Sequence, residues 1–327
     1  MARFFHSAFK GVRDYSNPSQ GCTDNELIKR YRFNREGIDF LVDLLKKDLT
    51  HAGPGRAQIK PEIQILATLN YLASNSFEIH VADSFGITQQ TVSTIVKRVT
   101  TSLANKASEF IYFPNDMNKL KRDFYSYCRM PLTIGALDGT HIRIQAPNIE
   151  DERSYVNRKN FHSLNVLGIV DANTKFLHVS ASWPGSCHDS HGGNAGNSIL
   201  LGDSGYPLRK WLIVPFKTPN TDEEKKFNRF LCKGRARVEH AFGLFKRRFS
   251  INHSGYRIEL SQIPTAITAC SVLHNIAIDR RLPIYEDEIE DDQPETEFFE
   301  ENVLTISERR SRQEGILKRN ELASRFR

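Results

Sequence analysis

Cysteine is scarce in this 327-residue chain, and no CxxC pair occurs. The five copies are scattered and comprise Cys22, Cys128, Cys187, Cys232 and Cys270. An odd number without paired spacing argues against a disulfide framework and against a zinc site built from cysteines. The pattern is typical of proteins from a reducing compartment.

Long apolar runs are also missing. No stretch approaches the ~18–20 apolar residues that a helix needs to cross a bilayer. The N-terminal sequence MARFFHSAFKGVRDY is interrupted by polar and charged side chains, so it lacks the apolar centre of a signal peptide. We therefore expect a soluble, intracellular protein with no membrane partner.

Acidic residues are few outside one short segment. Residues 286–301 hold ten Asp or Glu and no Lys or Arg, which leaves 29 acidic residues against 45 basic ones in the rest, a net charge of +16. This strongly basic remainder of the chain suits binding to a polyanion such as nucleic acid, although the charge could also serve only to keep the protein soluble.

The order of the expected elements predicts an α/β fold in two parts. Residues 1–25 are expected to be irregular, and apolar residues recur at helical spacing through residues 26–130. After Met130, short β-branched runs predict strands, which give way to helices within an α/β domain at 131–282. Residues 283–327 are expected to form an acidic and then mixed-charge tail. The expected helices cover 25–51, 61–75, 76–85, 88–107, 115–130, 221–249 and 261–280.

Residues 76–99 have the pattern of a helix-turn-helix. Ala82 would allow two helices to approach closely, Gly86 can adopt the positive φ of the turn, and Thr88 suits an N-cap. The second helix would then present candidate base-reading residues and candidate phosphate-binding residues. The first group is Gln89, Gln90, Ser93 and Thr94, and the second is Lys97 and Arg98. The alternative is an ordinary helical hairpin.

Four carboxylates in the expected α/β domain are candidates for a metal site: Asp138, Asp189, Asp203 and Glu239. Asp138 lies within an apolar strand, where an unpaired acid is costly to bury. Closely packed carboxylates repel each other unless a cation neutralises them, and oxygen ligands suit Mg²⁺ or Mn²⁺. Nearby basic residues that could bind the DNA backbone are Arg235, Arg237, Lys246, Arg247 and Arg248.

Each acid also has another interpretation. Asp138 or Asp203 could cap a turn, and Glu239 could pair with Arg235 on its helix. Asp189 could belong to a zinc site with His188 and His191. Spacing alone does not decide between these interpretations.

Six ordered motifs resemble a known family. They are ALDGTHIRIQAP, SYVNRKNFHSLNVLGIVDAN, SWPGSCHDS, LLGDSGYPLRKWLIVPF, RVEHAFGLFKRRF and CSVLHNIAI. Together they resemble the harbinger transposase-derived nucleases of the PIF/Harbinger superfamily of DDE transposases, over roughly residues 25–280.

The resemblance implies a ribonuclease-H-like nuclease domain and a metal-dependent endonuclease that hydrolyses DNA. Asp138, Asp203 and Glu239 would be catalytic, and Asp189 would join them as a metal ligand. It also implies a separate Myb-like partner that supplies DNA recognition, and a location in the nucleus as well as the cytoplasm. A further motif of unassigned role, Asn157, Arg158, Lys159 and His162, would contact phosphates or form structural hydrogen bonds.

One departure from the family concerns the segment between Asp189 and Asp203. Only SHGGNAGNSILLG lies there, where family members usually carry a longer insert with a helix. Since the segment joins two of the four acids, a catalytically weak or silent DNA-binding or adaptor protein is the alternative function. A purely helical interaction module fits less well because the middle of the chain is rich in strands. The sequence predicts neither the oligomeric state nor the target site.

Overall fold

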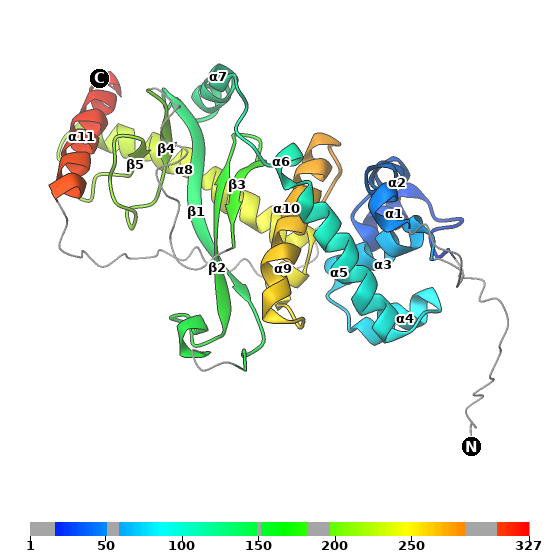
Figure 1. Ribbon diagram of the computed structural model, residues 1–327. Coiled ribbons are helices and arrows are strands. Elements are labelled where there is room, and N and C mark those ends of the chain that lie inside the picture. The colour runs from blue at the N-terminus through cyan, green and yellow to red at the C-terminus, as the bar shows by residue number, and fades with distance from the viewer. Residues whose placement is uncertain (1–16, 51–58, 149–151, 182–196, 285–305, 327) are drawn as a thin grey trace. The chain divides into compact units, whose positions relative to one another are not determined.

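The computed structural model describes residues 17–50, 59–148, 152–181, 197–284 and 306–326 (Figure 1). The chain divides into two compact units, residues 1–102 and 103–327. Some sequence predictions concern positions outside the described residues. These are residues 1–16, 51–58 and 285–305 and the candidate metal ligands Asp189, His188 and His191. No helix in the described ranges is long and apolar enough to span a membrane.

The first unit contains helices only in its described part. These are α1 (Asp24–Tyr31), α2 (Arg35–Leu49), α3 (Pro61–Ser74), α4 (Glu78–Phe85) and most of α5 (Gln89–Asn105). Thr23 and Glu26 form a capping box that starts α1, and the Asn34 side chain caps α2. α3 is buried along most of its length, as expected of a helix surrounded by α1, α2 and α4. The helices predicted at 61–75, 76–85 and 88–107 are confirmed. The single helix expected over 25–51 is instead two helices, because Arg32 ends α1 in a left-handed conformation and Asn34 starts α2.

The turn between α4 and α5 follows the sequence prediction. Gly86 has a φ of +63°, a conformation that most side chains resist, and it ends α4. The Thr88 hydroxyl accepts a hydrogen bond from the Thr91 amide, as an N-cap does. Val81, Phe85 and Val92 are buried beneath the turn.

The second unit is built on a five-stranded mixed sheet. Its strands are β1 (Thr133–Arg143), β2 (Ser163–Val170), β3 (Phe176–Ser180), β4 (Ile199–Leu201) and β5 (Leu212–Ile213). Their order is β3-β2-β1-β4-β5, in which β1, β2 and β3 are antiparallel while β4 and β5 run parallel to β1. The helices are α6 (Ala107–Phe110), α7 (Met117–Cys128), α8 (Asp222–Arg248), α9 (Ile251–Ser254), α10 (Ile263–Asp279) and α11 (Ile306–Ala323).

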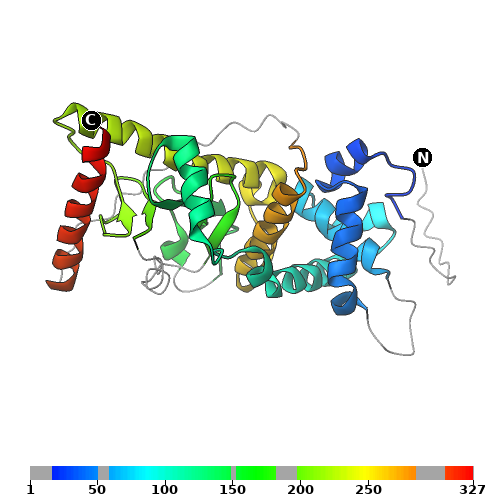
Figure 2. The same ribbon diagram turned by 90° about the horizontal axis from the view of Figure 1, so that it is seen from above.

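Helices α7 and α8 cover opposite faces of this sheet (Figure 2). Leu137 and its strand partner Ile169 pack with Leu120 of α7. The next pair along, Asp138 and Gly168, therefore faces the other way, because neighbouring residues of a strand alternate. A side chain at Gly168 would collide with Phe242 of α8, so this glycine lets α8 approach the sheet closely.

The C-terminal segment differs from the prediction. Residues 283–327 were expected to be a tail outside the nuclease domain, but α11 and the following 3-10 turn pack on α8 and β5 of the second unit. Phe326 stacks on Phe230, and Leu322 is fully buried. The expected domain boundary at residue 130 also differs, because α7 packs with the sheet and belongs to the second unit.

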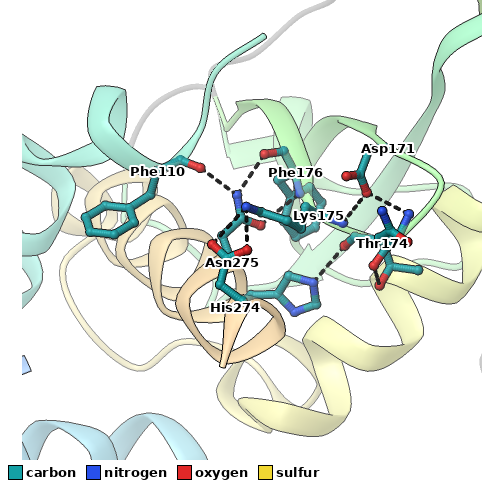
Figure 3. A network of polar contacts seen from close by, with 9 residues as sticks. Phe110, Asp171, Thr174, Lys175, Phe176, His274 and Asn275 are labelled. Carbon is teal, nitrogen blue, oxygen red and sulfur yellow. Dashed lines mark hydrogen bonds and ion pairs between the residues drawn. The ribbon is translucent and has the colours of Figure 1, made fainter. Parts of the chain in front are cut away.

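A buried polar network joins α10 to the turn between β2 and β3 and to α6 (Figure 3). Asn275 donates to the carbonyls of Phe110 and Phe176 at 2.8 Å each and accepts from the Phe176 amide at 2.8 Å. His274 Nε2 lies 2.9 Å from the Thr174 carbonyl. We call these five residues the Asn275 network. The family-like motif CSVLHNIAI thus contributes two of its residues to a structural junction.

Candidate active site

Two of the candidate aspartates lie side by side because of strand register. β1 and β4 run parallel, with Ala136 opposite Leu201. Asp138 and Asp203 each lie two residues beyond this pair, so both reach the same place on the sheet. Asp138 has 9% of its surface exposed and Asp203 has 8%.

The third acid comes from α8. Glu239 follows Arg235 by one helical turn, which places both side chains on the same face of the helix. Gly234 fixes how closely this face approaches the sheet, because a side chain there would collide with Leu201 of β4. Thr221 and Glu224 form the capping box that starts the helix.

Arg235 contacts all three acids. Its Nη1 donates to Asp138 Oδ2 at 3.1 Å, its Nη2 donates to Glu239 Oε1, and its Nε lies 3.9 Å from Asp203 Oδ1. The alternative reading of Glu239 as the helical partner of Arg235 is therefore confirmed, but the pairing extends to both aspartates. We call Asp138, Asp203, Glu239 and Arg235 the carboxylate site.

The charges at this site do not balance. Burial raises the pKa of Asp138 to about 7, against the opposing effect of Arg235. Burial lowers the pKa of Arg235, but Glu239, Asp138 and Asp203 together raise it above its ordinary value, so the guanidinium is charged. Three carboxylates thus surround a single cation.

The donor chemistry fits a hard divalent cation. Asp203 Oδ2 is buried and has no hydrogen-bond partner among the described residues, which is costly for a carboxylate oxygen unless it meets a cation. Carboxylate oxygens are the ligands that Mg²⁺ and Mn²⁺ prefer. Within the described ranges, however, no three His, Cys, Asp or Glu side chains are gathered closely enough to hold an ion. The guanidinium of Arg235 occupies the space between the acids.

The structure corrects part of the expected basic surface. Arg235 points at the acids, and Arg248 is only 1% exposed and donates to the Leu282 carbonyl. Neither side chain is available to the DNA backbone as predicted. Arg237 is partly exposed and stacks on Tyr127 of α7, with its Cζ atom 3.7 Å from the ring centre.

Most of the predicted reading residues of α5 are exposed. Gln89, Gln90, Ser93, Thr94 and Lys97 lie at the surface, and Arg98 is partly exposed. The Thr94 hydroxyl donates to the Gln90 carbonyl, so it is partly engaged by its own helix. Glu78 of α4 accepts hydrogen bonds from the Ser93 and Gln89 side chains.

The motif of unassigned role contains structural hydrogen bonds. The Asn157 side chain accepts from the amides of Lys159 and Phe161, which shapes a turn. His162 Nε2 lies 2.8 Å from Glu152 Oε1. For Asn157 and His162, the structural interpretation therefore has direct support.

Known proteins resemble the chain over most of its length. Residues 137–275 match the family model described as "DDE superfamily endonuclease". A Mus musculus protein named "Putative nuclease HARBI1" is 37% identical over 90% of both chains, and its Homo sapiens counterpart is 35% identical over the same shares. The chain belongs to the Harbinger-derived DDE nuclease family.

More distant relatives of this Harbinger-derived nuclease occur in plants. The Arabidopsis thaliana "Protein ALP1-like" is 26% identical over 94% of this chain and 82% of its own length. No solved structure matches. Membership makes the protein a transposase-derived nuclease, a hydrolase whose substrate is nucleic acid. One feature of the carboxylate site was not predicted from the sequence, namely that Arg235 contacts all three acids.

Proposed function

We propose that this Harbinger-derived nuclease is a DNA endonuclease whose divalent metal, Mg²⁺ or Mn²⁺, is held by Asp138, Asp203 and Glu239, with Asp189 as a further ligand. The convergence of three acids from β1, β4 and α8 carries the proposal, since they come from distant parts of the chain to one place. The mixed sheet with the order β3-β2-β1-β4-β5 supports a ribonuclease-H-like domain.

When bound, the metal would activate a water and stabilise the leaving oxygen of the phosphodiester. Asp138 and Asp203 are held in position by the paired strands, and Glu239 by a helix whose approach to the sheet Gly234 sets. Rigid supports of this kind keep ligand oxygens in place. The exposed Lys233 and the partly exposed Arg237 of α8 both lie over the Tyr127 ring of α7 and offer positive charge for the DNA backbone.

Cleavage of supercoiled plasmid DNA in Mn²⁺ tests this proposal. Asp138→Ala and Glu239→Ala should each reduce cleavage by at least about a thousandfold, since each removes a metal ligand. Asp279→Asn, an exposed acid of α10, is the matched control and should cleave normally. Thermal unfolding must show that all three variants are folded. Equal cleavage by the Asp138→Ala variant would reject the assigned site.

We further propose that α4 and α5 form a helix-turn-helix that contacts DNA through Gln89, Gln90, Ser93, Thr94, Lys97 and Arg98. Lys97→Ala should weaken DNA binding, and it should reduce the slope of log affinity against log salt concentration by about one. Lys46→Ala on α2 removes an equally exposed lysine and should change neither. An unchanged affinity in Lys97→Ala would assign this helix pair to the scaffold.

The partner and location are proposed on family grounds. A Myb-like protein would supply additional DNA recognition, and the protein would occur in the nucleus and the cytoplasm. Co-purification of the full chain with such a partner tests the first statement, and imaging of a tagged chain tests the second. A chain that binds DNA with steep salt dependence but never cleaves it would instead be the adaptor that the short 190–202 segment suggested.

A further inference from the structure

We infer that Arg235 is an internal counter-ion that occupies the carboxylate site in the absence of metal and competes with the metal for it. This inference rests on the proposed metal site and deepens it. It assigns a specific residue of the chain to the control of metal affinity.

The first argument is positional. The guanidinium is bonded to Asp138 and Glu239 and is the nearest cation to Asp203 in the described part of the second unit. A metal ion shared by these acids would need their oxygens within about 2.0–2.2 Å of one point. With the guanidinium between them, the acids do not reach that arrangement. Metal and guanidinium therefore cannot both hold the same oxygens.

The second argument is electrostatic. Arg235 is largely buried, with 17% of its side chain exposed, and burying a charge without partners is strongly unfavourable. Burial of the three acids is also unfavourable, because three carboxylates at one place repel each other. One guanidinium reduces this repulsion but leaves Asp203 Oδ2 without a hydrogen-bond partner in the part of the chain that the structure describes. The site is thus partly neutralised and remains attractive to a second cation.

Competition has a thermodynamic consequence. If the state with Arg235 among the acids dominates, only the remaining fraction of molecules can bind metal, and the apparent affinity falls by that fraction. Removing the guanidinium should raise metal affinity while it lowers the stability of the metal-free protein. A role in which Arg235 merely supports the fold predicts the second effect without the first.

The test uses the full-length protein stripped with EDTA. Calorimetric titration with Mn²⁺ compares wild type with Arg235→Gln, and Arg229→Gln, an exposed arginine of the same helix, is the matched control. Arg235→Gln should bind Mn²⁺ roughly tenfold more tightly or better, while the control binds as wild type does. In EDTA, Arg235→Gln should unfold at a lower temperature than wild type, and Mn²⁺ should restore much of the difference.

Two further variants keep the result decisive. Arg235→Lys retains a charge but lacks the planar fork that reaches several acids, so it should show an intermediate gain even if Arg235→Gln fails to fold. Adding Asp138→Asn to Arg235→Gln should cancel the gain, which locates it at these acids.

Unchanged or weaker Mn²⁺ binding in both Arg235 variants, with binding intact in wild type, would overturn the competition and leave the proposed nuclease site standing. No Mn²⁺ binding in any protein, at concentrations that support cleavage in related assays, would overturn both.

Discussion

Two clusters of polar side chains in the described part of the nuclease unit, the Asn275 network and the carboxylate site, are built differently. The Asn275 network is neutral, and both polar atoms of the Asn275 side chain bond to backbone groups. Within this network, His274 Nδ1 has no partner among the described residues. The carboxylate site is charged, and its three acids share one guanidinium. Asn275 is fully buried, whereas the carboxylate site keeps slight exposure.

The difference separates a junction that stabilises the fold from a site prepared for a ligand. Neutral groups with matched partners recover the cost of burial, while unbalanced charges do not. Functional sites are where such instability is retained. Substitutions that preserve shape should therefore have opposite effects in the two places.

The largest effect is expected at Asn275. Asn275→Ala removes three hydrogen bonds to the backbone groups of Phe110 and Phe176, and the two bonds to Phe176 are buried. The free energy of unfolding should fall by about 3–5 kcal/mol, measured by urea denaturation. A loss below about 1 kcal/mol would mean that water replaces the side chain, and the junction would not be a stabilising one.

At Asp138, by contrast, a substitution is expected to raise the free energy of unfolding. The pKa of this carboxyl is raised from 3.8 to about 7 in the folded protein, so its contribution to stability is greatest at low pH and is lost as pH rises towards 7. Asp138→Asn keeps the shape and removes the charge. In EDTA at pH 8 it should stabilise the protein by about 1–3 kcal/mol, although it abolishes cleavage.

The gain in Asp138→Asn should shrink when the same unfolding experiment is done at pH 5, where the wild-type carboxyl is protonated. Asp171→Asn is a useful control, because Asp171 is a buried acid whose oxygen accepts from the Asn173 and Lys175 amides. That variant should not stabilise the protein. If Asp138→Asn destabilises the metal-free protein at pH 8, the two regions do not differ as described.

Sequence patterns predicted the helices well because apolar spacing is a local property. The turn at Gly86 and the cap at Thr88 were also local, and the structure shows both. The three acids were predicted to converge from motif order and family resemblance. Their shared arginine was not, because its contacts with Asp138 and Asp203 depend on the register of α8 against β1 and β4.

The remaining differences have the same cause. The sequence predicts only a mixed-charge tail where α11 lies, yet Leu322 is buried and Phe326 packs on Phe227 and Phe230 of α8. Arg248 looked like an exposed cation at the end of a basic run, but its guanidinium donates to the Leu282 carbonyl. Burial of a charged side chain by a distant segment leaves no periodic trace in the sequence.

A moderate, pH-dependent effect is expected at His274. Burial lowers the pKa of this imidazole to about 3 from an ordinary 6.5, and its Nδ1 has no partner in the described structure. The neutral form therefore stabilises the fold above pH 6.5, and this stabilisation is lost as pH falls towards 3. Wild type should lose up to about 1.4 kcal/mol of unfolding free energy per pH unit in that range from this group.

His274→Gln isolates the contribution, because glutamine can still donate to the Thr174 carbonyl but does not titrate. The variant should be less stable than wild type at pH 7, and its deficit should become smaller at pH 5. Parallel stability curves for the two proteins between pH 7 and pH 4 would show that His274 is not held neutral.

The smallest effect is expected where a polar contact of α10 reaches solvent. Asp279 pairs with Lys175 at 2.7 Å, a shorter distance than the 2.8–2.9 Å hydrogen bonds of the Asn275 network, but 53% of the Asp279 side chain is exposed. Exposed ion pairs contribute about 0.2–1 kcal/mol because water and salt screen them. Asp279→Asn should therefore cost less than about 1 kcal/mol, and the cost should vanish in 1 M salt, whereas that of Asn275→Ala should persist. A cost at Asp279 as large as that at Asn275 would mean that distance, rather than burial and neutrality, determines which polar contacts stabilise this unit.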